Sequence, residues 1–283
     1  MYPVLKYLLL LVNLWISFPM VSSVVDTIEV RSRKMSRNIP CVVIVPDKMV
    51  DGSCYPVLYL LHGYNATGYS NSHKVWIDNI KTNLSQLADQ YGIMIVCPNG
   101  ENSWYWDSAK ERKSQFETFI SKELVEYIDE HYFTVSNRSG RAITGASMGG
   151  HGALWLAIRH QDVFGASGSM SGGVDIRLFP DKWNIHSLLG ERAKNKKIWD
   201  KHVVMSQLNK LKNGNLALII DCGYDDFFFS ENEELHRRLL EQKIDHDYIV
   251  RPGGHTWSYW NNSIDYQILF FSKFFCKNKL NNK

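Results

Sequence analysis

The segment Gly145–Gly149 (Gly-Ala-Ser-Met-Gly) has the residue types and spacing of an activated serine nucleophile. It matches G-x-S-x-G, a strained turn between a strand and a helix that exposes a serine hydroxyl. Glycines two residues before and after Ser147 leave room where strand and helix approach each other. Residues 141–144 before the motif suit a strand, and residues 153–158 after it suit a helix. The pattern occurs nowhere else in the chain. We therefore predict a nucleophilic Ser147 rather than an ordinary glycine-rich turn.

A serine hydroxyl needs a base, and in this type of site the chain order is serine, acid, histidine. His255 follows the last expected strand and two glycines, so we predict that it is the base. The competing His246 lies among charged residues, where a surface position is expected. Asp226 is the predicted acid, with Asp225 as the alternative, because both lie on the loop after an apolar strand that ends near 221.

An oxyanion hole requires two backbone N–H groups directed at the developing negative charge. Met148 directly follows the serine, and Tyr64 follows a long apolar strand, so these two amides are the predicted donors. His62, at the end of that strand, is predicted to be structural.

Two aromatic groups follow strand ends and are expected to rim the site. One contains Trp104 and Trp106, and the other contains Trp257 and Trp260. Exposed rings there would stack on a flat acyl group or a sugar, so Trp104, Trp106 and Trp257 are predicted to bind substrate. The alternative for Trp257 and Trp260, which are spaced i, i+3, is that they anchor the final helix.

Apolar strands alternate with amphipathic helices along the chain, which predicts an α/β-hydrolase type of doubly wound, mostly parallel sheet. The expected strands are 26–33 and 39–46, as a leading antiparallel pair, then 56–62, 93–98, 141–146, 165–171, 216–222 and 248–252. The expected helices are 76–91, 114–131, 148–160, 231–242 and one from about 257. Residues 174–214 break the alternation and are expected to form a helical insertion over the carboxyl edge of the sheet.

The composition narrows the functional classes. The 283 residues carry Lys+Arg 32 against Asp+Glu 29, a net charge of +3, with no long basic run. Nucleic-acid binding is therefore not expected. Five cysteines without a CxxC pair, and no HExxH, argue against zinc, and no cofactor is expected. Cys41 and Cys54 could pair if their segments are neighbouring strands.

The N-terminus predicts export. One lysine precedes an apolar run at 8–18, and small side chains follow at 21–23, which is typical of a signal peptide and short for a membrane span. We expect residues 1–23 to be removed, leaving one domain at 24–283 that is secreted or periplasmic and not inserted in a membrane. The oligomeric state is not predicted.

Several segments together resemble the esterase D ("Putative esterase") family. They are 62–64 (His-Gly-Tyr), 98–100 (Pro-Asn-Gly), 103–105 (Ser-Trp-Tyr), 145–153 (Gly-Ala-Ser-Met-Gly-Gly-His-Gly-Ala), 222–226 (Cys-Gly-Tyr-Asp-Asp) and 253–255 (Gly-Gly-His). The resemblance covers nearly all of the mature chain and implies a serine esterase in which Asp226 is the acid. The family includes tributyrin-type, feruloyl and acetyl xylan esterases, S-formylglutathione hydrolases and mycolyltransferases.

Two departures narrow the resemblance. The region 98–107 lacks the longer insertion of the S-formylglutathione hydrolases, and His62-Gly63 replaces the Asp-Gly of mycolyltransferases. Export, aromatic residues and the resemblance lead us to expect hydrolysis of short acyl or hydroxycinnamoyl esters on plant polysaccharide. The alternatives are an acyltransferase of mycolyltransferase type and a non-catalytic carbohydrate-binding module on the same fold.

Overall fold

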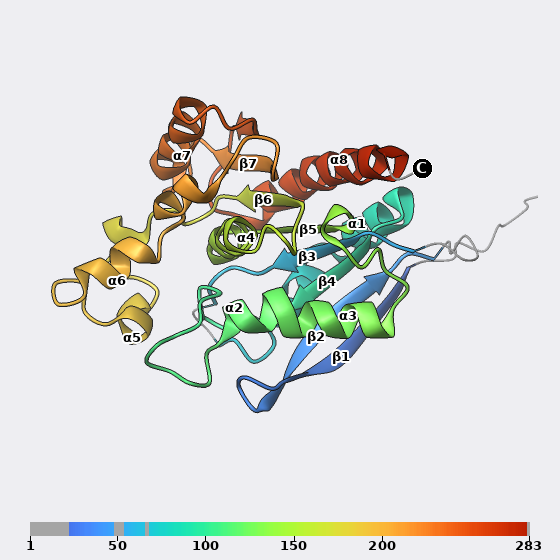
Figure 1. Cartoon of the computed structure of the whole chain (residues 1–283), viewed down its shortest axis with the longest axis horizontal. Helices are drawn as coiled ribbons and strands as arrows, with labels where there is room; N and C mark the ends of the chain where they lie inside the picture. The colour runs from blue at the N-terminus through green and yellow to red at the C-terminus, as the bar shows by residue number, and fades with distance from the viewer. Residues whose placement is uncertain (1–22, 48–53, 66–67, 282–283) are drawn as a thin grey trace, which may run out of the picture.

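The computed structural model describes residues 23–47, 54–65 and 68–281. The predicted signal peptide therefore lies outside the described residues, apart from Ser23. The described part forms one eight-stranded sheet with helices on both faces (Figure 1).

The sheet has the strand order β1-β2-β4-β3-β5-β6-β7-β8. Its strands are β1 Val24–Ser32, β2 Arg37–Val45, β3 Val57–Leu61, β4 Met94–Pro98, β5 Arg141–Gly145, β6 Ala166–Met170, β7 Ala217–Gly223 and β8 Asp247–Arg251. β1 and β2 are antiparallel, β2 is antiparallel to β4, and all later pairs are parallel. The expected leading hairpin and the mostly parallel sheet are thus confirmed.

The central strand β3 shows why the sheet needs cover on both faces. All five of its residues are buried, as expected for parallel strands between helix layers. Its side chains alternate between faces: Val57, Tyr59 and Leu61 join one hydrophobic cluster, while Leu58 and Leu60 join the other.

Five long helical segments form the two layers. They are α1 Val75–Tyr91, the continuous segment α2 Phe116–Thr118, η2 Phe119–Leu124 and α3 Val125–His131, then α4 Met148–Arg159, α7 Phe229–Glu241 and α8 Trp257–Asn281. The buried residues of α1 and α8 share one cluster, and those of α4 and the α2–α3 segment share the other. The middle of the 114–131 helix, η2, has π-helical hydrogen bonding, which the periodicity did not reveal.

The region between β6 and β7 consists of short helices at one end of the molecule (Figure 1). They are η4 Ile176–Leu178, α5 Ile185–Leu189, α6 Lys196–Lys201, η5 Val204–Ser206 and η6 Leu208–Lys210. Buried side chains such as Ile185 and Trp199 attach this region to the core of the domain.

Cys41 and Cys54, which could have paired had their segments been neighbouring strands, are both free in the described structure. Cys41 lies on β2, which is flanked by β1 and β4, whereas Cys54 lies just before β3. Cys97 and Cys222 are buried, as expected of small apolar side chains. Among the described helices, none combines the length and the apolar character needed to span a membrane.

Candidate active site

Ser147 lies on a tight turn between β5 and α4. Its φ of 59° and ψ of −119° lie in a region that non-glycine residues rarely adopt. Neighbouring backbone holds this conformation: the Ser147 N–H donates to Met170 O at 2.9 Å. The Ser147 carbonyl accepts from the His151 N–H at 3.1 Å and from the Gly173 N–H at 3.3 Å.

The glycines of the pentapeptide are needed for close backbone approach. A Cβ on Gly145 would lie 2.5 Å from Leu61 O, and one on Gly149 would lie 2.3 Å from the same atom. Both distances are far below van der Waals contact, and the obstacle is backbone that cannot rotate away. The steric reason expected from the sequence therefore holds at both positions.

His255 joins Ser147 to Asp226. Its Nε2 lies 2.9 Å from Ser147 Oγ, and its Nδ1 lies 2.9 Å and 3.1 Å from the two carboxylate oxygens of Asp226. The Asp226 carboxylate is buried and also accepts from the Phe228 N–H at 2.9 Å. Asp225 is exposed and makes no contact with the imidazole in the described structure. The geometry thus favours Asp226 over the alternative.

Asp221 and the competing His246 have structural contacts instead. Asp221, at the end of β7, pairs with Arg251 of β8 and accepts from Tyr259 Oη of α8 at 2.5 Å. These bonds tie two strands and a helix together below the site. His246 contacts His236 at 2.7 Å, away from Ser147.

The amides of Tyr64 and Met148 flank the serine. Met148 is the first residue of α4, and a Cβ on Gly63 would lie 3.2 Å from Ser147 Cβ, so the loop carrying Tyr64 approaches the nucleophile closely. Within the described residues, neither amide donates a hydrogen bond. The twelve-residue helix α4 also directs the positive end of its dipole toward this point.

His62 holds the Tyr64 loop in place. Its Nδ1 donates to Gly63 O at 2.7 Å, and its Nε2 accepts from the Gly100 N–H at 2.9 Å. Burial lowers the pKa of His62 to about 4, so the ring is neutral and can play both roles. The structure thus gives this histidine the contacts of a structural residue.

The expectation that Trp104 and Trp106 rim the site as exposed rings is wrong. Both side chains are 1% exposed and belong to the hydrophobic core. The intervening Tyr105 is wedged so tightly that a Cβ on Gly100 or on Gly152 would lie 2.2 Å from its ring. The loop after β4 therefore folds inward beneath the site.

A cavity of about 400 Å³ opens beside Ser147 and is mostly apolar. Trp257 lines it, as predicted, together with Trp260. Sequence reasoning missed Trp183 and Phe227. The Phe227 ring lies 4.3 Å from the His255 ring and stacks on Trp183 at 6.0 Å. The available signals were a tryptophan in a polar insertion and a run of phenylalanines directly after Asp226.

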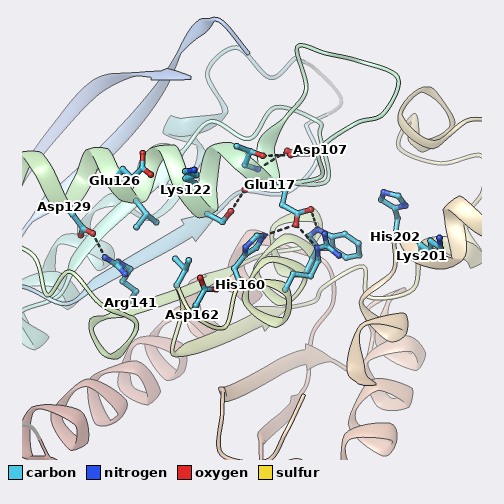
Figure 2. Close-up of a pocket in the computed structure, with 16 residues that line it drawn as sticks. Asp107, Glu117, Lys122, Glu126, Asp129, Arg141, His160, Asp162, Lys201 and His202 are labelled. Carbon is cyan, nitrogen blue, oxygen red and sulfur yellow. Dashed lines mark hydrogen bonds and ion pairs between the residues drawn. The ribbon is translucent and has the colours of Figure 1, made fainter. Parts of the chain in front are cut away.

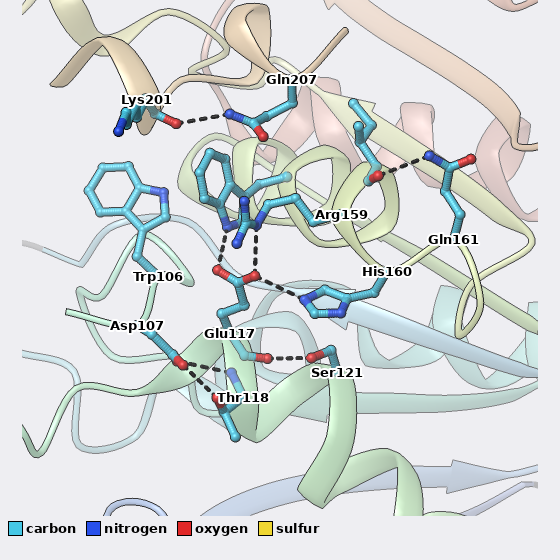
Figure 3. Close-up of polar contacts among 12 residues, drawn as sticks. Trp106, Asp107, Glu117, Thr118, Ser121, Arg159, His160, Gln161, Lys201 and Gln207 are labelled. Atoms are coloured by element: carbon cyan, nitrogen blue, oxygen red, sulfur yellow. Dashed lines mark hydrogen bonds and ion pairs between the residues drawn. The ribbon is translucent and has the colours of Figure 1, made fainter. Parts of the chain in front are cut away.

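A larger cavity of about 750 Å³ lies elsewhere, along the α2–α3 segment and the end of α4 (Figure 2). Its wall is charged, and the central carboxylate of Glu117 is already bound by Arg159 and His160 (Figure 3). These contacts, with the Trp155 indole, offset the effect of burial and lower the pKa of Glu117 to about 2. The hydroxyls of Thr118 and Ser121 in this cavity donate to the Asp107 carboxylate and to a backbone carbonyl, and neither contacts a histidine. We therefore place the candidate active site at Ser147, whose hydroxyl contacts His255. The described residues contain no cluster of side chains suited to hold a metal ion.

Known proteins share this architecture and part of the sequence. The model of the family described as "Putative esterase" matches residues 32–271. The acetyl esterase of Caldicellulosiruptor saccharolyticus is 27% identical over 271 residues, covering 86% of this chain and 96% of that protein. A fluorophosphonate-binding serine hydrolase of Staphylococcus aureus superposes with a TM-score of 0.78 at 20% identity, covering 88% of this chain and 98% of that one. A solved ferulic acid esterase superposes with a TM-score of 0.75 at 26% identity, covering 90% and 99%. The chain belongs to the "Putative esterase" family, and it is a carboxylic ester hydrolase with the α/β-hydrolase fold.

Proposed function

We propose that Ser147 is the nucleophile, His255 the general base and acid, and Asp226 the residue that orients the imidazole. The observation that carries this proposal is the continuous contact Asp226–His255–Ser147, with each step at about the length of a hydrogen bond. His255 Nε2 takes the Ser147 proton as Oγ attacks the ester carbonyl carbon. The N–H groups of Met148 and Tyr64 then stabilise the oxyanion of the tetrahedral intermediate.

The remaining steps follow from the same geometry. His255 gives the proton to the leaving alcohol, the C–O bond of the ester breaks, and the acyl group stays on Ser147. Water then attacks the acyl-serine while His255 accepts its proton, and His255 returns that proton to Ser147 Oγ as the acyl C–O bond breaks and the carboxylic acid leaves. The buried Asp226 keeps the proton of the neutral imidazole on Nδ1, which leaves Nε2 free to act as the base.

We propose that the substrates are short acyl or hydroxycinnamoyl esters of plant polysaccharide and that the protein is exported. The aromatic lining of the cavity suits a flat acyl group, and its volume suits a small one. The acetyl esterase and the ferulic acid esterase among the relatives support the same substrates.

The test is labelling with a serine-directed phosphonate, followed by turnover of 4-nitrophenyl acetate, methyl ferulate and a long-chain 4-nitrophenyl ester. We expect label on Ser147 alone and no turnover by Ser147→Ala, with the wild-type melting temperature retained. Label on another residue would refute the nucleophile, and a preference for the long chain would refute the substrate class. Adding an alcohol acceptor separates hydrolysis from acyl transfer, because a transferase would form mainly the new ester.

A further inference from the structure

The buried Trp106 forms a hydrogen bond with a second buried histidine, besides His62. Its indole Nε1–H donates to Nε2 of His151 at 3.0 Å. His151 lies on α4, four residues after Ser147, and is completely buried. Its other ring nitrogen, Nδ1, lies 3.0 Å from Gly173 O. Neither side chain lines the cavity beside Ser147.

These contacts fix the tautomer of His151. An indole N–H can only donate, so Nε2 must accept, and the single proton of the neutral ring is on Nδ1. Nδ1–H therefore donates to Gly173 O. Burial lowers the pKa of His151 to about 3, so the ring stays neutral. The bond to Gly173 O and the charge of Asp175 oppose that shift, and His202 adds to it.

The network reaches the nucleophile through backbone groups. The Gly173 N–H and the His151 N–H both donate to the Ser147 carbonyl oxygen, at 3.3 Å and 3.1 Å. A trans peptide unit is planar, so this carbonyl and the N–H of Met148 point in opposite directions. Whatever fixes the direction of the Ser147 carbonyl therefore also fixes the direction of the Met148 N–H.

We propose that His151, with its tautomer set by Trp106, is a positioning residue that holds Gly173 against Ser147 and so directs the Met148 N–H at the oxyanion. The inference rests on the proposed catalytic role of Ser147. It assigns no contact with substrate to either side chain. The strained conformation of Ser147 makes such support necessary, because a residue of this kind relaxes unless its surroundings over-determine it.

The loop at Gly173 is closely packed. A Cβ on Gly173 would lie 3.0 Å from Trp104 Cζ3 and 3.1 Å from Phe228 Cζ, so a side chain there would press on both rings. Backbone groups hold the loop: the His151 ring binds the Gly173 carbonyl, and Asn232 Nδ2 donates to the neighbouring Gly172 carbonyl at 2.9 Å.

Variants at His151 test the role of its Nδ1–H as the hydrogen-bond donor to Gly173 O. His151→Leu keeps an apolar side chain but removes the donor, whereas His151→Asn places an amide N–H near the position of Nδ1. We expect His151→Leu to lower kcat for 4-nitrophenyl acetate about 10- to 100-fold, with KM within about threefold, because misplaced catalytic groups cost that much. The rate of phosphonate labelling should fall in parallel. His151→Asn should restore kcat to within about threefold of wild type.

A matched pair of tryptophans gives a second measurement that does not depend on His151 variants folding. Trp106→Phe removes the N–H that sets the tautomer, and Trp155→Phe removes an equally buried N–H that donates to Glu117 at 3.0 Å instead. We expect kcat to fall about 3- to 10-fold in Trp106→Phe and to stay within about twofold of wild type in Trp155→Phe.

The His151 variants and the tryptophan variants are all measured at a temperature where each protein is folded. A wild-type kcat in His151→Leu, or equal losses in the Leu and Asn variants, would overturn the inference. If His151→Leu does not fold, equal effects of Trp106→Phe and Trp155→Phe would overturn it. If the wild-type protein is not labelled on Ser147, the proposed function itself fails, whatever these variants do.

Discussion

The replacement Asp226→Asn exchanges one carboxylate oxygen for an NH2 group, and the structure predicts how the amide will be oriented. The Phe228 N–H donates to Asp226 Oδ1 at 2.9 Å, so the amide oxygen of Asn should occupy that position. The amide nitrogen then takes the position of Oδ2, 2.9 Å from His255 Nδ1. An amide N–H facing Nδ1 requires a ring without a proton on Nδ1, which moves the proton to Nε2.

A protonated Nε2 cannot accept the hydrogen of Ser147 Oγ, so the base is lost although the fold is intact. An inverted tautomer of this kind lowers kcat by about 10⁴, or about 5.5 kcal/mol of transition-state stabilisation. We expect that loss in kcat for 4-nitrophenyl acetate, with KM changed little.

Asp225→Asn is the matched control, because it makes the same chemical change on an exposed neighbour. We expect its kcat to stay within about threefold of wild type, since an exposed charge has little influence on a buried pair. The melting temperatures of both variants show whether a loss comes from unfolding. An Asp226→Asn protein that is folded and keeps a tenth of the activity would refute the tautomer reasoning, and so would equal losses at both positions.

Four further outcomes are expected. Trp183→Ala should lower kcat/KM for methyl ferulate more than for 4-nitrophenyl acetate, because the lost ring lines the cavity for a flat acyl group; equal losses would remove it from the substrate site. Gly149→Ala should give little folded protein, since the new Cβ would lie 2.3 Å from a backbone oxygen of β3; a wild-type melting curve would contradict this. Burial lowers the pKa of His62 to about 4 and of His151 to about 3, so below about pH 6.5 the unfolded chain binds more protons than the folded one. The free energy of unfolding should therefore decrease as the pH is lowered, by about 4 kcal/mol between pH 7 and pH 5 for the two histidines together. Equal free energies of urea unfolding at pH 7 and pH 5 would refute this. N-terminal sequencing of the exported protein should begin near Val24, and an intact first methionine on cytoplasmic protein would contradict export.

The sequence by itself predicted a mostly parallel sheet and the succession of strands and helices along the chain. Parallel strands between two helix layers are apolar throughout, so segments such as 57–61 stand out in any reading of the chain. Ser147 and His255 were also predictable, because the glycines beside them mark turns whose backbone geometry few other residues tolerate. These signals are local, and the fold only had to bring them to one edge of the sheet.

Only the tertiary structure decided which aromatic residues face the cavity and which acid faces the histidine. Trp104 and Trp183 are both tryptophans near a site, and nothing in their neighbours along the chain distinguishes a buried ring from one that lines a cavity. Asp225 and Asp226 are adjacent and chemically identical, and they are distinguished by the direction of the loop after β7. Side-chain direction in loops depends on contacts with distant segments, here β8 and the insertion, whereas strand and helix patterns repeat along the chain itself.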